Sequence, residues 1–149
     1  MPLPAPSPGL VISYAYLWKD QRSAGNVEGR KARPCAIVVS ARNDDGDTVA
    51  YVAPITHVEP NELGGVEIPA AVKRRLGLDD ARSWIVTSEL NRFVWPGYDL
   101  RPIARDRPGT FAWGFLPVNL FAEVKRMIAE NHRTGRARVV DRDRPAGQS

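Results

Sequence analysis

The sequence is poor in the residues that build covalent and metal-bound frameworks. Its 149 residues contain a single cysteine, Cys35, and two histidines, His57 and His132. A lone cysteine has no partner for an intrachain disulfide, and these three soft ligands are too few to predict a structural zinc site. Cys35 lies in the apolar run 35–39 (CAIVV), where a small buried side chain is its expected role.

Membrane and targeting signals are missing as well. No apolar run approaches the roughly 18–20 residues needed to cross a bilayer. Residues 1–8 hold four prolines and lack the basic and apolar segments of a signal peptide. We therefore expect a soluble, cytoplasmic protein with no membrane partner. The chain also has no glycine-rich phosphate loop, no helix with paired histidines and no nucleophile elbow, so neither a metal nor a cofactor is expected.

Length and composition indicate one domain with a core of its own. A chain of 149 residues is short for two domains, and 43% of its residues are hydrophobic. The formal net charge is +4, which raises the expectation of a polyanionic partner such as a nucleic acid, although the excess is modest.

Periodicity and turn residues predict several short strands and two helices. Pro69 and Gly77 bound a short helix that runs through Leu76, and a single apolar face predicts a longer helix over residues 117–133. The segment 43–47 (NDDGD) has the composition of a hairpin turn. The expected strands cover residues 10–18, 35–40, 48–55, 66–68 and 83–87.

These elements predict an α+β, mostly β fold, a partly open antiparallel barrel with helices packed outside it. Residues 1–9 are proline-rich and are expected to form an extended arm. Residues 10–133 form the predicted domain. Residues 134–149 have no apolar period, and we expect a disordered basic tail that is dispensable for folding.

Two pieces of sequence have the composition of a functional site. The first ends the long polar segment 19–33, which carries five basic residues against two acidic ones, and it reads Glu28-Gly29-Arg30-Lys31-Ala32-Arg33-Pro34 before an apolar strand. The second reads Ala53-Pro54-Ile55-Thr56-His57 and closes the paired strand. Loops as long as 19–33 with no predicted structure of their own are often functional.

This order of motifs resembles the PemK/MazF family of toxins. An Arg-Pro pair entering an apolar strand, a glutamate five residues before the arginine, and Pro-Ile-Thr ending the next strand all occur in that family. The segment Ser88-Glu89-Leu90-Asn91-Arg92-Phe93 and the final helix fit the same pattern. The resemblance spans about residues 10–132 and rests on the order and spacing of short motifs.

The resemblance implies an SH3-like barrel that forms a homodimer and cleaves single-stranded RNA (mRNA) without a metal, as the toxin of a toxin–antitoxin system with a cognate antitoxin protein. It implies catalytic roles for Arg33, Thr56 and Glu28, with the segment 19–32 covering the RNA groove. The candidate RNA-binding residues are Lys19, Arg22, Arg30, Lys31, His57, Asn91 and Arg92.

The chemistry of RNA transphosphorylation supports part of this assignment. Attack by a ribose 2′-hydroxyl on the adjacent phosphate needs a proton acceptor, a proton donor and positive charge near the phosphorane oxygens. Arg33 suits that charge because its planar guanidinium donates two parallel hydrogen bonds, and Thr56 offers one hydroxyl donor. Arginine is a poor base, so the base is either Glu28 or His57. If the strand continued past Thr56, His57 would point to the opposite face.

Two rival interpretations stay open. Residues 66–78 resemble the strand-Pro-helix-Leu-Gly-Leu element of AbrB-type DNA-binding proteins, which favours a nucleic-acid-binding module without catalysis. A toxin fold that poisons an enzyme, as in the related CcdB group, would need no Arg33/Thr56 pair. The four tryptophans are expected in the core, with Trp95 in its Pro-Gly turn as the one candidate for stacking on a nucleobase.

Overall fold

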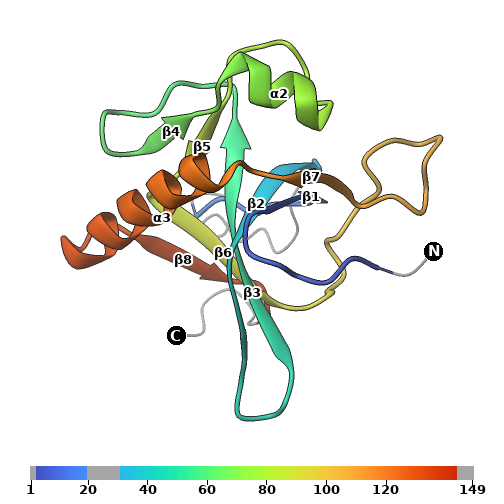
Figure 1. Cartoon of the computed structure of the whole chain (residues 1–149). Helices are drawn as coiled ribbons and strands as arrows, with labels where there is room; N and C mark the ends of the chain where they lie inside the picture. Colours follow the sequence, from blue (N-terminus) through green and yellow to red (C-terminus); the bar gives the residue numbers. More distant parts are fainter. Residues whose placement is uncertain (1–2, 20–30, 144–149) are drawn as a thin grey trace.

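The computed structural model describes residues 3–19 and 31–143 of the chain. Across these residues it contains eight strands and two helices (Figure 1). In chain order they are β1 (Leu10–Tyr14), β2 (Arg33–Arg42), β3 (Thr48–Thr56), β4 (Gly65–Glu67), α2 (Ala70–Leu76), β5 (Trp84–Val86), β6 (Glu89–Val94), β7 (Ala112–Phe115), α3 (Val118–Arg133) and β8 (Arg138–Asp141).

The strands form one mostly antiparallel sheet, which confirms the α+β, mostly β class. The strand order is β4-β5-β3-β2-β1-β7, with β6 added on β3 and β8 added on β6. The long strand β3 pairs with β6 through its first half and with β5 through its last two residues. Only β6 and β8 pair in parallel among the described strands, and the sheet they belong to does not close into a barrel.

The predicted β2–β3 hairpin is present. The side-chain oxygen of Asn43 accepts hydrogen bonds from the backbone amides of Asp45 and Asp47, at 3.1 and 2.9 Å. Gly46 takes a positive φ of 82°, a conformation that costs glycine little because it has no Cβ. The turn composition at 43–47 therefore set the register of the two central strands.

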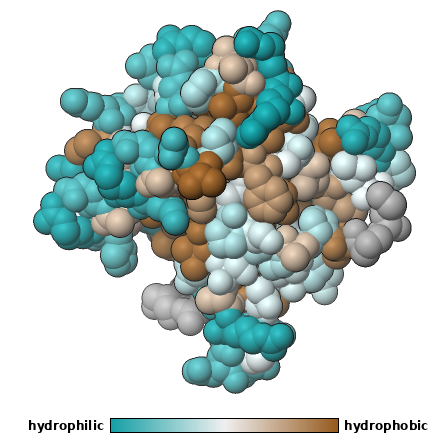
Figure 2. All heavy atoms as spheres, viewed as in Figure 1, coloured by the Kyte–Doolittle hydropathy of each residue, from teal (hydrophilic) through white to brown (hydrophobic). Residues whose placement is uncertain are grey.

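Both predicted helices are also confirmed. Helix α2 begins after Pro69 and ends at Gly77, whose φ of 78° and backbone amide close the last turn on the carbonyls of Lys73 and Arg74. Helix α3 buries Val124 against the sheet, as its apolar face predicted. The outer faces of the two helices and the tip of the β2–β3 hairpin are hydrophilic, and apolar side chains gather between them (Figure 2).

The centre of the sheet is buried on both faces. Along β1, Val11 packs in a core cluster with Val124 of α3, whereas its neighbour Ile12 packs with Phe93 in a second cluster. Side chains of a strand alternate between faces, so a strand with two apolar sides reads as a continuous apolar run. This explains why residues 10–14 show no alternation of polar and apolar residues.

The prediction of a disordered tail is wrong for the described part of that segment. Residues 138–141 form β8, which pairs with β6, and Val140 is 2% exposed. The guanidinium of Arg142, with its side chain 3% exposed, donates to the backbone oxygen of Ala15 at 2.8 Å and pairs with Asp99 at 3.0 Å. Two adjacent valines are too few to show the alternation that predicts a strand. The order of this segment comes instead from its backbone pairing with β6 and from the buried guanidinium of Arg142. Residues 144–149 lie outside the described residues.

Two further strands, β6 and β7, were not among the strands that periodicity predicted. The first predicted strand, at 10–18, ends at Tyr14, although residues 15–17 stay buried. Among the described residues, no helix has both the length and the apolar character required to span a membrane.

Cys35 is expected to be chemically silent in the folded protein. Its side chain is 0% exposed in β2, and burial raises the pKa of the thiol well above its ordinary value. The thiolate is the reactive form, so both access and ionisation are suppressed. We expect no labelling by iodoacetamide in native buffer and labelling of one thiol in guanidinium chloride. Rapid native labelling would show that β2 opens or that Cys35 is exposed.

Candidate functional site

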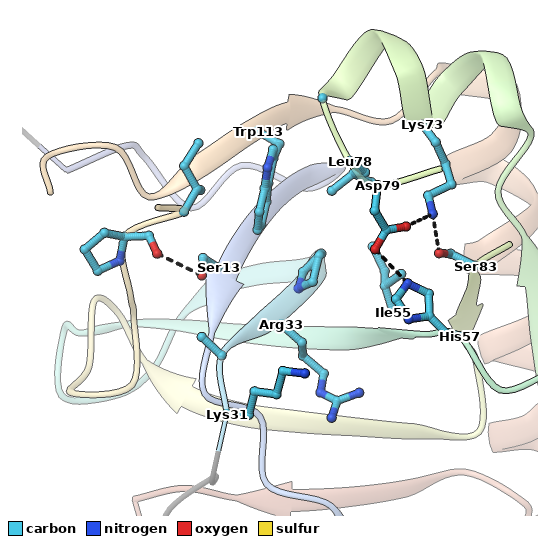
Figure 3. A pocket seen from close by; sticks show the side chains of 15 residues that line it. Ser13, Lys31, Arg33, Ile55, His57, Lys73, Leu78, Asp79, Ser83 and Trp113 are labelled. Carbon is cyan, nitrogen blue, oxygen red and sulfur yellow. Dashed lines mark hydrogen bonds and ion pairs between the residues drawn. The ribbon is translucent and has the colours of Figure 1, made fainter. Parts of the chain in front are cut away.

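A pocket with charged walls lies where α2 and the loop after it face the start of β2 (Figure 3). It has a volume of about 450 Å³ and is open to solvent. Its charged and hydroxyl side chains come from Lys31, Arg33, His57, Lys73, Asp79, Ser13 and Ser83, and its apolar side chains include Ile55, Leu78, Ile103 and Trp113.

Arg33 is held in this pocket by an aromatic ring. It is the first residue of β2, and its guanidinium carbon lies 5.1 Å from the centroid of the Trp18 ring. Trp18 in turn meets the edge of Tyr16, with 5.0 Å between ring centroids. No described residue accepts a hydrogen bond from the buried Nε of Arg33. The cation–π contact therefore helps to orient the guanidinium on the pocket wall.

His57 lies just beyond the end of β3 and is held by a carboxylate. Its Nε2 atom is 2.9 Å from Oδ2 of Asp79, and both side chains are more than half exposed. Thr56, the last residue of β3, does not line the pocket. The hydroxyl oxygen of Thr56 accepts the backbone N–H of Val58 at 3.1 Å, which fixes the turn that carries His57.

Asp79 is shared between His57 and a buried lysine. The Lys73 side chain is 5% exposed, and its Nζ atom donates to Oδ1 of Asp79 at 2.5 Å and to the hydroxyl of Ser83 at 2.6 Å. A third hydrogen bond reaches the backbone oxygen of Ala81. The hydrogen bond from Lys73 is the main cause that lowers the pKa of Asp79, burial opposes it, and the charges of Lys73 and His57 lower the pKa further. Asp79 is therefore a carboxylate under ordinary conditions.

The structure brings together only some of the residues singled out from the sequence. Lys31, Arg33 and His57 line one pocket, and Thr56 adjoins it. Lys19 is exposed and offers its backbone amide to Glu89 at 3.0 Å. Glu28, Arg22 and Arg30 lie outside the described residues.

Asn91 and Arg92 have other partners. Asn91 is 0% exposed, and its amide bonds both backbone polar groups of Leu17, at 2.9 and 2.8 Å. Arg92 pairs with Asp141 at 3.2 Å, away from the pocket that holds Arg33. Asn91 therefore has no surface to offer a ligand, and Arg92 helps to hold β8.

The pocket residues that the sequence analysis missed include Lys73, Asp79, Ser83 and Trp113. One signal was available for Lys73, because it lies three residues before the buried Leu76 and so shares its helical face. Trp113 was expected in the core, and it is only partly buried, with its ring in the pocket wall.

The pocket is suited to an anion that carries an apolar or aromatic group. Arg33 and Lys31 supply positive charge, whereas Trp113 and Leu78 supply apolar surface. Within residues 3–19 and 31–143, no group of three or more histidine, cysteine or acidic side chains is placed to hold a metal ion. No protein-family model and no curated protein matches this sequence.

Proposed function

We propose that the protein is an endoribonuclease that cleaves single-stranded RNA by attack of the ribose 2′-hydroxyl, with no metal in the reaction. The observation that carries the proposal is that Arg33, Lys31 and His57 line one pocket. Arg33 begins β2 and His57 follows the end of β3, and these two strand ends lie side by side because the strands pair antiparallel. Arg33 can supply the positive charge and His57 the proton acceptor that this reaction requires.

In the proposed reaction His57 takes the proton of the 2′-hydroxyl as that oxygen attacks the phosphorus. Arg33 donates hydrogen bonds to the non-bridging oxygens, where negative charge grows. The bond from phosphorus to the 5′-oxygen then breaks, and the 5′-oxygen takes a proton from water in the open pocket, while His57 returns its proton to the hydroxide that remains. The products are a 2′,3′-cyclic phosphate and a 5′-hydroxyl, so atoms and charge balance without a redox step.

Of the two candidate bases, the proposal assigns the role to His57. His57 is oriented by Asp79 on the pocket wall, whereas Glu28 lies outside the described residues. Thr56 stays a candidate donor, because its oxygen accepts a backbone N–H while its own hydroxyl proton is available to a phosphate oxygen.

The wider part of the proposal follows the resemblance to PemK/MazF toxins. It includes an SH3-like arrangement of the open sheet, a homodimer, a cognate antitoxin as partner and action on mRNA in the cytoplasm. The open mostly antiparallel sheet and the net charge of +4 support it. Phe115 and Val118, which are 53% and 84% exposed, offer apolar surface for association.

Purified protein is expected to cleave a defined single-stranded RNA in the presence of EDTA. Mapping of the ends should give a 2′,3′-cyclic phosphate upstream and a 5′-hydroxyl downstream. A heat-denatured sample is the control for contaminating nucleases, together with the Arg33→Ala variant. Loss of cleavage in EDTA with rescue by magnesium would refute the mechanism. Binding of nucleic acid without cleavage would favour the AbrB-like interpretation, and absence of both would favour an enzyme-poisoning toxin.

A further inference from the structure

A connected line of charged side chains runs down one wall of the pocket, from Lys73 through Asp79 to His57 (Figure 3). The two oxygens of the Asp79 carboxylate are divided between its neighbours, since Oδ1 accepts from Lys73 and Oδ2 faces Nε2 of His57. The lysine end is buried and the histidine end is open to solvent. The buried Lys73 therefore anchors Asp79, which in turn holds His57 on the wall of the pocket where a ligand would bind.

We propose that Lys73 and Asp79 are positioning residues that hold His57 as the Nε2–H tautomer, so that Nδ1 is the atom that accepts the proton of the ribose 2′-hydroxyl. This inference deepens the proposed function and rests on it for its catalytic part. The tautomer itself is a property of the free protein and is testable without RNA.

The tautomer follows from the hydrogen-bonding rules of the groups involved. An ionised carboxylate only accepts hydrogen bonds, so the nitrogen 2.9 Å from Asp79 must carry the proton. In a neutral imidazole the other nitrogen then holds a lone pair. The His57 side chain is 58% exposed on the pocket wall, so we expect Nδ1 to be open to a ligand.

Lys73 makes the arrangement rigid. An ammonium has three donors, and all three are used, on Asp79, Ser83 and the Ala81 carbonyl. The carboxylate is thus fixed by a buried anchor and does not depend on the exposed imidazole for its orientation. The lowered pKa of Asp79 supports the same conclusion, because a protonated acid could donate to Nε2 and reverse the tautomer.

A purely structural role for the same contacts is the alternative. Lys73 ties α2 to the loop 79–83 whether or not His57 has a function. The two interpretations differ in the state of the imidazole and in the step that a variant slows. A structural clamp predicts changes in stability alone, whereas a positioning role predicts changes at Nδ1 and in the maximal rate.

Nitrogen-15 spectra of the imidazole rings would test the tautomer directly. The chain has only two histidines, so His132 serves as an internal reference in the same sample. We expect neutral His57 to be almost wholly Nε2–H, and we expect this preference to fall in Asp79→Asn. A population of His57 tautomers equal to that of His132, or unchanged in Asp79→Asn, would overturn the proposal.

Kinetics of RNA cleavage would test the positioning role. Asp79→Asn should lower kcat by about 10²–10⁴-fold with little change in KM, the size of effect seen when the carboxylate of a catalytic triad is made neutral. Glu67→Gln is the matched control, because Glu67 also pairs with a cation of the same loop region, Arg82 at 2.9 Å, but does not line the pocket.

The two tests separate the failures of the two proposals. A wild-type protein that cleaves no RNA refutes the proposed function, while the tautomer measurement still decides the arrangement of His57. Cleavage by the wild type with unchanged kcat in Asp79→Asn refutes the positioning role and leaves the nuclease in place. Lys73→Met would remove the buried anchor of Asp79. If this variant fails to fold, as judged by circular dichroism, the spectra of the wild type and of Asp79→Asn still determine which nitrogen of His57 carries the proton.

Discussion

Replacement of Arg33 by alanine is expected to lower the maximal rate of RNA cleavage by about 10²–10³-fold, the cost of removing one preorganised donor from a developing oxyanion. Arg33 is oriented by the Trp18 ring and has a buried Nε with no described acceptor, so the guanidinium is in place before RNA binds. Single-turnover cleavage at saturating protein is the measurement. Arg33→Lys should restore little, because an ammonium keeps the charge and loses the planar fork.

Lys31 is the matched control for Arg33, since it is basic, lines the same pocket and lies two residues away. It is exposed, and a flexible ammonium acts on phosphate mainly as a point charge. Lys31→Ala should therefore weaken RNA binding and reduce its salt dependence while the saturated rate stays nearly unchanged. Equal and small effects of the two alanine variants, with folding intact, would remove Arg33 from the mechanism.

A chain truncated after Ala137 is expected to lose about 10 °C or more of melting temperature. It lacks β8 and Arg142, whose buried guanidinium pairs with Asp99 and donates to Ala15. Breaking a buried ion pair costs about 3–5 kcal/mol, and exposing the Val140 site costs about 1.5–3 kcal/mol more. For a chain of this size each kcal/mol corresponds to about 2–4 °C.

The control for this truncation is a chain that ends at Asp143, which keeps every contact described for β8 and Arg142. Arg142→Met in the full chain separates the contribution of the guanidinium from that of the strand. The melting temperatures of the chain ending at Ala137, the chain ending at Asp143 and the Arg142→Met variant are compared by circular dichroism. Equal melting temperatures for the chains ending at 137 and 143 would show that β8 contributes nothing to stability.

The fold was predictable where a local rule decided it. The Asn-Asp-Asp-Gly turn, the Pro69 start and Gly77 end of α2, and the apolar face of α3 each depend on a few neighbouring residues. Strand β8 was missed because its stability comes from pairing with β6, almost fifty residues earlier, and from a buried arginine. A basic segment with two valines has no local feature that marks it as ordered.

The site was harder to predict than the fold. Arg33, Lys31 and His57 carry recognisable chemistry at the ends of predicted strands, and all three line the same pocket. His57 would point away from Thr56 only in a continuing strand, and β3 ends at Thr56, so the alternation no longer applies. The spacing from Leu76 places Lys73 on the buried face of α2, but nothing local shows that the loop after α2 turns back over it.

The contact between Arg142 and Ala15 also constrains how the chain is made. These residues are 127 positions apart, so the segment after β1 meets the segment after β8 only once the chain between them has been made. Pairings this distant are slow to form, because the intervening chain must be closed into a loop first. A nascent chain therefore lacks this contact until Arg142 has been synthesised, and we expect the contact to form late in folding.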